Sequence, residues 1–231
     1  MPNDVLTTRQ SEFLRSIDTP TVCNLIEVVM PSRRGSGYTV KHLRCPFPDL
    51  PAIVGYAKTV KIKSREPFKA NSSGYMAKRL DYLDYVAAAP QPGISVIEDS
   101  DGEHAGYGAF WGEVQTNVHK ALGVLGVVTN GSVRDIPMVA KRFQMLAGSI
   151  APSHAFVHIE EYGTPVNVHG MAVESGDLMH ADRHGAVVVP ADKVDEMMKA
   201  LEGLLEREAR IIRAANDPDM TVEKIKEAMR G

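Results

Sequence analysis

The chain has 231 residues, of which 44% are apolar and 24% charged, as in an ordinary globular domain. A net charge of −3 without any run of Lys or Arg gives no electrostatic basis for binding nucleic acid. No apolar stretch reaches the length of a membrane span. The two cysteines lack a CxxC spacing and argue against a disulfide scaffold or zinc finger. Together with the polar first ten residues, they favour a cytoplasmic protein.

The N-terminal part is predicted to hold two short helices followed by a loop. Thr7 or Thr8 would cap the first helix, and Asp18 or Thr19 would cap the second. Gly, Pro and Ser recur over residues 31–51 and predict a loop-rich segment.

Alternating strand and helix patterns follow. A strand is expected from Ala52, and its second half over 59–63 alternates polar and apolar residues as a half-exposed strand does. A helix is expected over 76–89 and a short strand over 94–97. This order of elements is typical of an α/β fold.

Residues 113–143 continue the α/β pattern in a more informative way. A helix is expected over 113–122 and a buried strand over 126–129. Asn130-Gly131 is predicted to form a turn, and a further helix is expected over 135–143.

The last third divides into short strands and a long helix. Several strands with glycine turns over 150–190 predict a second, mostly antiparallel layer. Helical spacing of apolar residues predicts a helix over 191–215, with a last short helix after Thr221. We therefore expect one α/β domain over 1–190 and a helical extension over 191–231, packed on the domain or on a neighbouring subunit.

The candidate site combines two short segments. Glu113 and Arg134 are separated by twenty residues, and Asp135 follows directly. If the intervening helix and strand form one unit, both segments reach one crevice beside the strand ends, within a subunit or across an interface. Free N–H groups at a helix start after Gly112 suit a carboxylate.

Each charged group of this site has a chemical rationale. The Arg134 fork can hold a carboxylate or a developing enolate. Asp135 is a hard oxygen ligand of the kind that Mg²⁺ or Mn²⁺ accepts, and Glu113 is suited to anchoring a metal-bound water. A metal held in this way would polarise a 2-oxo group and stabilise an enolate. On spacing alone, an Arg-Asp pair beside a turn such as Arg134-Asp135 is more often a surface ion pair or a helix cap than a functional site.

Longer stretches of sequence carry a family resemblance. The run GVLGVVTNGSVRDIP from Gly123 and the run GTPVNVHGMAVESGDLMHADRHGAVVVP from Gly163 resemble the RraA-like family, which includes the class II 4-hydroxy-4-methyl-2-oxoglutarate/4-carboxy-4-hydroxy-2-oxoadipate aldolases. Members carry an acid, twenty residues, then Arg-Asp, as this chain does from Glu113. The resemblance weakens towards Thr19, and Asn24 stands where the family tends to have an acid.

The resemblance implies a fold and an activity. The fold is an α/β/β/α sandwich similar to a phosphohistidine swivelling domain, assembled as a homotrimer or homohexamer with sites at subunit interfaces. The implied reaction is metal-dependent cleavage of a small 2-oxo acid to pyruvate, with oxaloacetate decarboxylation as a side activity. The implied substrate-binding residues are Gly112, Glu113, Val114, Gln115 and Arg134. Asp135 would hold Mg²⁺ or Mn²⁺ directly, and Glu113 through a water.

Other candidate residues have simple structural roles as well. His154 and His158 are expected on one face of a strand, as end caps or facing a neighbouring subunit. Asp177 and Asp182 are expected to form turns beside glycines. Phe110-Trp111 would either line the pocket or anchor its loop in the core.

A second function is compatible with the same resemblance. The family's namesake branch consists of non-catalytic proteins that bind and regulate ribonucleases, and that branch lacks the acidic pair that metal binding needs. Glu113 and Asp135 are both present here. This favours the enzyme over the regulator.

Overall fold

The computed structural model describes residues 5–69 and 72–230, so the predicted polar start at 1–4 and the final residue of the tail lie outside the described residues. The helices are α1 (Thr8–Ser16), α2 (Thr19–Val29), α3 (Ser72–Ala87), α4 (Glu113–Ala121), α5 (Val194–Ala215) and α6 (Val222–Arg230). The strands are β1 (Ile53–Lys63), β2 (Gly93–Asp99), β3 (Ala109–Trp111), β4 (Val124–Val133), β5 (Gln144–Ile150), β6 (His158–Tyr162), β7 (Val166–Val168), β8 (Met171–Val173), β9 (Leu178–Asp182) and β10 (Gly185–Val188).

A mixed sheet organises the molecule in the order β10-β9-β1-β2-β4-β3, with β5 added on β4 and β6 added on β1. β1, β2 and β4 run parallel, and β3 and β5 run parallel to β4. β6 and β9 pair antiparallel with different halves of β1, and β10 pairs with β9. β7 and β8 form a separate hairpin.

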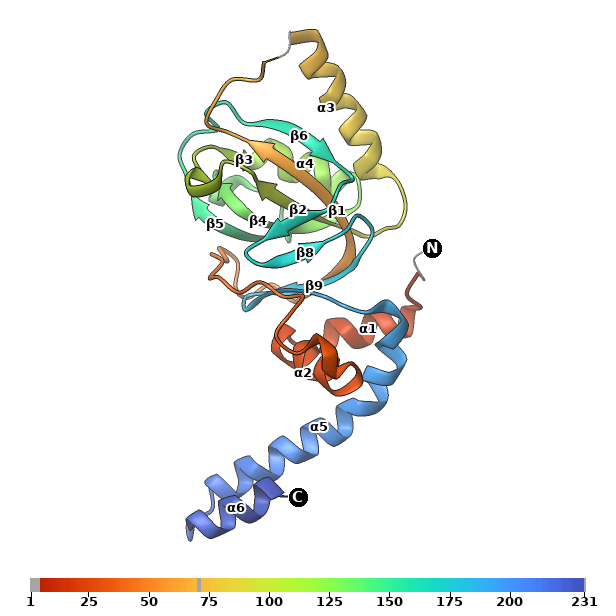
Figure 1. The fold of residues 1–231 in the computed structure, drawn as a ribbon, viewed down its shortest axis with the longest axis vertical. Coiled ribbons are helices and arrows are strands. Elements are labelled where there is room, and N and C mark those ends of the chain that lie inside the picture. The colour runs from red at the N-terminus through yellow and green to blue at the C-terminus, as the bar shows by residue number, and fades with distance from the viewer. Residues whose placement is uncertain (1–4, 70–71, 231) are drawn as a thin grey trace.

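Helices and the hairpin cover this sheet in layers (Figure 1). Tyr82 and Val86 of α3 pack on one face. On the other face, Val168 and Met171 of the hairpin bury residues of the central strands. Leu25 of α2 and other side chains of α1 and α5 pack beneath β9 and β10. This arrangement confirms the predicted α/β/β/α sandwich with a C-terminal helix.

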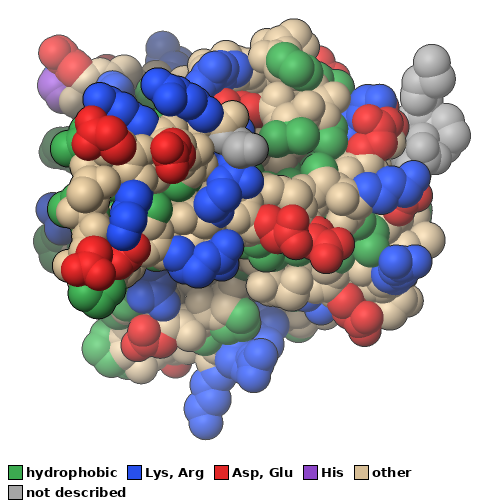
Figure 2. Space-filling view, turned by 90° about the horizontal axis from the view of Figure 1, so that it is seen from below, with side chains coloured by type: hydrophobic (Ala, Val, Ile, Leu, Met, Phe, Trp, Pro, Cys, Tyr) green, Lys and Arg blue, Asp and Glu red, His purple; other side chains and the backbone are tan. Residues whose placement is uncertain are grey.

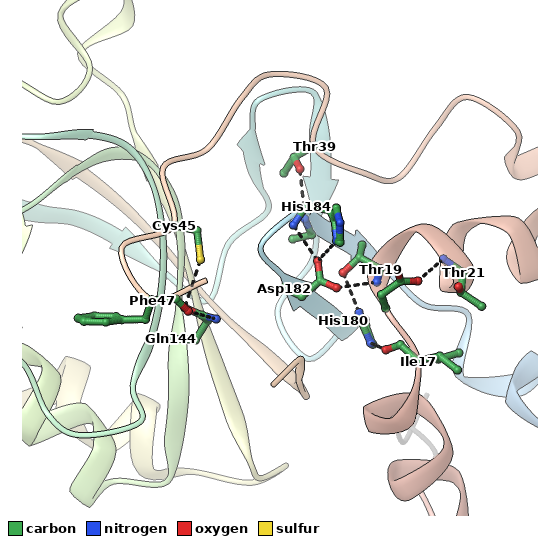
Figure 3. Close-up of polar contacts among 12 residues, drawn as sticks. Ile17, Thr19, Thr21, Thr39, Cys45, Phe47, Gln144, His180, Asp182 and His184 are labelled. Atoms are coloured by element: carbon green, nitrogen blue, oxygen red, sulfur yellow. Dashed lines mark hydrogen bonds and ion pairs between the residues drawn. The ribbon is translucent and has the colours of Figure 1, made fainter. Parts of the chain in front are cut away.

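The N-terminal helices are attached to β9 by buried polar side chains (Figure 3). The Thr19 N–H donates to Asp182 Oδ2 at 2.9 Å, in the first turn of α2. His180 Nε2 donates to the Leu14 carbonyl at 2.9 Å, while its Nδ1 accepts from the Thr19 hydroxyl at 3.0 Å. Because these groups are buried and paired, they fix α1 and α2 on the sheet without leaving polar atoms unsatisfied.

The C-terminal helices extend beyond the sheet. α5 starts against α1 and α2 and then runs away from the body, with α6 folded back along its far end (Figure 1). Val194 and Met197 at its start are buried, whereas Leu205 and Ile212 further along are exposed. Within the described residues, no helix is both long and apolar enough to cross a lipid bilayer.

The predicted turn at Asn130-Gly131 is wrong, because both residues lie inside β4. The register of β4 with β5 shifts between Thr129 and Ser132. At this irregularity, the Asn130 side chain accepts from the Asp99 N–H at 2.7 Å and donates to the Asp99 carbonyl at 3.0 Å. These two residues, which favour turns, therefore form a local irregularity within a longer strand.

The predicted helix over 135–143 is also wrong. Only a 3-10 turn, Ile136–Met138, is present, and Val139 after it is extended. The Ala140 N–H donates to the Thr116 hydroxyl of α4 at 3.0 Å instead of to a helical carbonyl. Ala140 and Phe143 are buried in the core, so packing on α4 outweighs the local helical pattern.

The strand from Ala52 is continuous and more buried than its alternation predicts. Lys58 and Thr59 are buried, and only Lys61 and Lys63 keep partial exposure. The reason is topological, because β1 pairs with β2, β6 and β9 along its edges and its side chains pack into all three hydrophobic clusters of the core. Of the short strands over 150–190, β6, β9 and β10 join the main sheet, and only the β7–β8 hairpin lies apart from it.

Candidate active site

The site forms where two parallel strands end side by side. Trp111 at the end of β3 is the register partner of Val133 at the end of β4, and the Arg134 N–H donates to the Trp111 carbonyl at 2.9 Å. α4 connects these strands, so both carboxyl ends meet at one edge of the sheet. The structure thereby brings Gly112 and Arg134, which are 22 positions apart, into contact.

Asp135 faces the start of α4. Its Oδ2 accepts at 3.3 Å the N–H of Glu113, the first residue of α4 after the capping position, and so pairs one of the free amides of the helix start. Gly112 holds that position and has no side chain. A Cβ at Gly112 would lie 2.4 Å from Asp135 Oδ2 and 3.2 Å from Arg134 Cγ. The absence of a side chain at Gly112 therefore permits this close approach.

The backbone of Asp135 contributes to the same geometry. Asp135 has φ 55° and ψ 31°, in the left-handed region of backbone conformation. Residues other than glycine, asparagine and aspartate rarely adopt this region. Its carbonyl accepts the Met138 N–H at 2.8 Å, which closes the following 3-10 turn. Arg134 Nε lies 3.6 Å from Asp135 Oδ2, and both side chains are about one-third exposed. The pair is thus accessible to a ligand.

A pocket of about 480 Å³ opens beside this pair. Its lining includes Gly112, Val114, Gln115, Arg134 and Asp135 of the predicted site. The Glu113 side chain does not line it and is exposed, so its role through a water stays a prediction. α3, the loop before β6 and β6 itself complete the wall with Tyr75, Arg79, His154, Phe156 and His158.

A buried histidine of α4 connects the first turn of that helix to α3. His119 Nδ1 donates to the Gln115 carbonyl at 2.8 Å, and its Nε2 accepts from the Tyr82 hydroxyl at 2.8 Å. Its ring also packs on Trp111, with ring centroids 4.6 Å apart. Burial lowers the pKa of His119 to about 4 and raises the pKa of Tyr82. The imidazole is therefore neutral near pH 7 and holds α4 on α3 and β3.

The donors around Asp135 limit the kind of metal ion that the site fits. The described residues contain no group of three or more His, Cys, Asp or Glu side chains placed to hold one ion. This rules out, among them, a four-ligand zinc site. Mg²⁺ and Mn²⁺ are held by one or two carboxylates, with water and substrate oxygens completing the shell. No described residue forms a hydrogen bond with Asp135 Oδ1. Asp135 therefore fits such an ion.

The other singled-out residues have structural partners. Asp177 Oδ2 accepts the Glu174 N–H at 2.8 Å, and Asp182 Oδ1 accepts the His184 N–H at 2.8 Å, so both aspartates form turns as expected. Burial opposes ionisation of Asp182, but hydrogen bonds from Thr19 and His184 outweigh it and lower its pKa. Phe110 lines the pocket, while Trp111 is buried in the core.

The prediction that His154 and His158 share one face of a strand is wrong. His158 begins β6, His154 lies in the loop before it, and both line the pocket. Each Nδ1 donates to a nearby backbone carbonyl, His154 to Ala155 at 2.7 Å and His158 to Phe156 at 2.8 Å. Asn24, the departure from the family pattern, lies on α2 and donates to Glu208 of α5 at 3.4 Å.

Comparison with known proteins identifies the family of the chain. A family model described as RraA-like, Aldolase/RraA, matches residues 19–188. The chain belongs to the RraA-like family. The match includes β1 to β10 and ends before α5, and it confirms the predicted family. This family includes both aldolases and inhibitors of ribonucleases.

Two relatives and one solved structure are 22% to 30% identical to this chain. An uncharacterized protein of Methanocaldococcus jannaschii is 30% identical over 118 residues, which are 50% of this chain and 57% of that protein's length. A protein of Halalkalibacterium halodurans, whose name suggests 4-hydroxy-4-methyl-2-oxoglutarate aldolase activity, is 26% identical over 80% of this chain and 81% of its own. RraAS2 of Streptomyces coelicolor, described as an unusual member of the RNase ES inhibitor RraA family, shares the fold with a TM-score of 0.65 at 22% identity, over 90% of this chain and 96% of its own.

Proposed function

We propose that this chain is a divalent-metal-dependent class II aldolase that cleaves a 4-hydroxy-2-oxo acid of the 4-hydroxy-4-methyl-2-oxoglutarate type and releases pyruvate. One observation carries the proposal. The ends of β3 and β4 bring the amides after Gly112, the Arg134 guanidinium and the Asp135 carboxylate to one pocket. These are the groups that a pyruvyl carboxylate and a divalent ion require.

Each residue has a distinct role in the proposed reaction. Arg134 and the N–H groups at the start of α4 bind the pyruvyl carboxylate. Water takes the proton of the C4 hydroxyl as the C3–C4 bond breaks, and C4 becomes the carbonyl carbon of the second product. The electron pair of the broken bond forms the enolate of the pyruvyl fragment, which Arg134 stabilises, and a proton added from water at C3 gives pyruvate. Mg²⁺ or Mn²⁺ on Asp135 supplies Lewis acidity towards the 2-oxo group when bound. Oxaloacetate decarboxylation passes through the same enolate and is proposed as a side activity.

The partners are part of the same proposal. They are a small 2-oxo acid and further copies of this chain, as a homotrimer or homohexamer with sites at subunit interfaces. We propose no nucleic-acid partner, because the chain has a net charge of −3 and no run of Lys or Arg. On the face towards α5 and α6, Lys and Arg are interleaved with Asp and Glu (Figure 2). A reducing cytoplasm suits Cys23 and Cys45, which are both free thiols.

Pyruvate release tests this function directly. The purified chain is assayed with 4-hydroxy-4-methyl-2-oxoglutarate and with oxaloacetate, in Mg²⁺, in Mn²⁺ and after chelation, with pyruvate coupled to lactate dehydrogenase. We expect metal-dependent release that falls at least about 100-fold in Asp135→Ala. Equal activity in the two proteins, or none in either, would contradict the proposal. Tight binding to a ribonuclease complex without metal affinity would favour the regulator instead.

A further inference from the structure

Arg79 is a cation of the pocket that the proposed reaction does not use. It lies on α3, lines the main pocket, and also lines an adjoining apolar hollow of about 210 Å³ between α3 and α4. Its guanidinium carbon lies 5.7 Å from the centre of the Tyr75 ring. Stacking on an aromatic ring limits the orientations of a guanidinium and leaves its N–H edge free to bind.

No acidic group neutralises Arg79 within the described part of the chain, where it has no Asp or Glu oxygen within 4.0 Å. The other charged side chains of the pocket wall are Arg134 and Asp135, which neutralise each other at 3.6 Å. The pocket therefore keeps an uncompensated positive charge in a chain of net charge −3. An unpaired guanidinium on a pocket wall is suited to binding a carboxylate in a bidentate manner.

The wall near Arg79 is apolar. Phe110, Val114 and Ile159 line both the main pocket and the adjoining hollow, as Arg79 does. A ligand in contact with both arginines would therefore place carbon on this wall and anionic groups on Arg79 and Arg134. That pattern is the chemistry of a short dicarboxylic acid, with one charge at each end of an apolar middle.

We propose that Arg79 binds the distal carboxylate of the substrate and so makes the site selective for 2-oxo dicarboxylic acids over 2-oxo monocarboxylic acids. The inference rests on the proposed function, because it takes Arg134 as the residue that binds the pyruvyl end. Arg79 is a substrate-binding residue in this account and takes no part in moving protons. Its loss therefore acts on binding of one class of substrate and leaves the chemistry of the other class unchanged.

Arg79→Gln tests the inference against Arg9→Gln, which removes an exposed cation from α1 as a matched change of charge. The substrates are 4-hydroxy-4-methyl-2-oxoglutarate and 4-hydroxy-4-methyl-2-oxopentanoate, in which a methyl replaces the distal carboxylate. We expect Arg79→Gln to lower kcat/KM for the dicarboxylate about 10- to 100-fold, mainly through KM. Its kcat/KM for the monocarboxylate should stay within about threefold of wild type, and Arg79→Lys should restore part of the loss.

A binding measurement separates this inference from the proposed reaction. Isothermal titration calorimetry measures ligand binding without turnover, so its result does not depend on the aldolase reaction. Wild type is expected to bind 2-oxoglutarate more tightly than 2-oxopentanoate, and Arg79→Gln to lose that preference. If the preference is lost as expected but no substrate is cleaved, the inference holds and the aldolase function fails. Equal effects of Arg79→Gln on both ligands or both substrates, no effect, or no binding of either ligand by wild type would overturn the inference.

Discussion

Gly112 and Asp135 show how single residues determine the site. Gly112 has an extended backbone, with φ −163°, so a larger residue is compatible with its conformation. What excludes a side chain is the space, because the Asp135 carboxylate and Arg134 approach the position where a Cβ would be. The close approach in turn lets Asp135 accept an N–H of α4 while its other oxygen stays available.

We predict that Gly112→Ala disrupts the active site while leaving the fold intact. The added Cβ must displace the Asp135 or Arg134 side chain, since it would lie 2.4 Å from Asp135 Oδ2. The expected result is a kcat/KM for pyruvate release at least about tenfold lower, or about 1.4 kcal/mol. Gly203→Ala is the control, because Gly203 lies on α5 and no neighbouring heavy atom lies within 4 Å of the position that its Cβ would take. The prediction fails if the two variants retain the same activity.

At this scale, spacing in the sequence predicts one half of the pocket and misses the other. Arg134 and Asp135 follow a strand, and a helix start lies one α–β unit before them, so local order is enough to predict their neighbourhood. Arg79 and His154 come from α3 and from the loop before β6. The approach of Arg79 and His154 to Arg134 depends on how elements distant in the sequence pack together. No local periodicity in the sequence indicates this packing.

At the scale of elements, α4 is the part that positions the site, and its anchor is polar. His119 connects its first turn to Tyr82 of α3 through two hydrogen bonds. The neutral imidazole can accept from one side and donate to the other, whereas the imidazolium can only donate. Protonation of His119 therefore breaks the bond from Tyr82 and leaves a charge buried.

The stability of the protein should depend on pH through His119. Burial lowers its pKa from 6.5 to about 4, so between these values the unfolded chain binds the proton and the folded chain does not. Stability is fully present above about pH 6.5 and falls as pH drops towards 4, by about 3 kcal/mol from this group. His119→Asn should reduce this slope in urea unfolding measured from pH 4.5 to 7.5.

His42→Asn, which removes an exposed imidazole, is the control for that measurement. A slope in His119→Asn as steep as that of wild type would show that His119 does not carry the dependence. The activity of His119→Asn at pH 7 is informative too. We expect it to fall with the loosening of α4, because Gln115 and the free amides of the site belong to the anchored turn.

Element boundaries show where local patterns give way to packing. The helical pattern over 135–143 is lost because Ala140 and Phe143 are drawn into the core and Thr116 supplies the hydrogen bond. The pair Asn130-Gly131 has a strong turn propensity and yet lies within β4. The reason is that the Asn130 side chain forms the hydrogen bonds with the Asp99 backbone that a neighbouring strand would otherwise form. The sequence predicted which elements exist in most places, but not how long each one is.

At the scale of the whole molecule, parallel pairing of β3 and β4 connects the fold to the site. The alternation of strands and helices predicts an α/β class, and the family resemblance predicts the layered sandwich that the structure shows. The course of α5 away from the sheet was not predictable, since its amphipathic pattern does not say what it packs on (Figure 1). The division into a domain over 1–190 and an extension stays a prediction.

The central claim is a division of labour in which Asp135 holds the metal and Arg134 holds the pyruvyl carboxylate. The most direct measurement is Mn²⁺ binding followed by electron paramagnetic resonance, together with binding of oxalate, a mimic of the pyruvate enolate. We predict that Asp135→Asn weakens Mn²⁺ binding at least about tenfold. Arg134→Gln should bind Mn²⁺ as wild type does but lose oxalate. Undiminished Mn²⁺ binding by Asp135→Asn would contradict the claim.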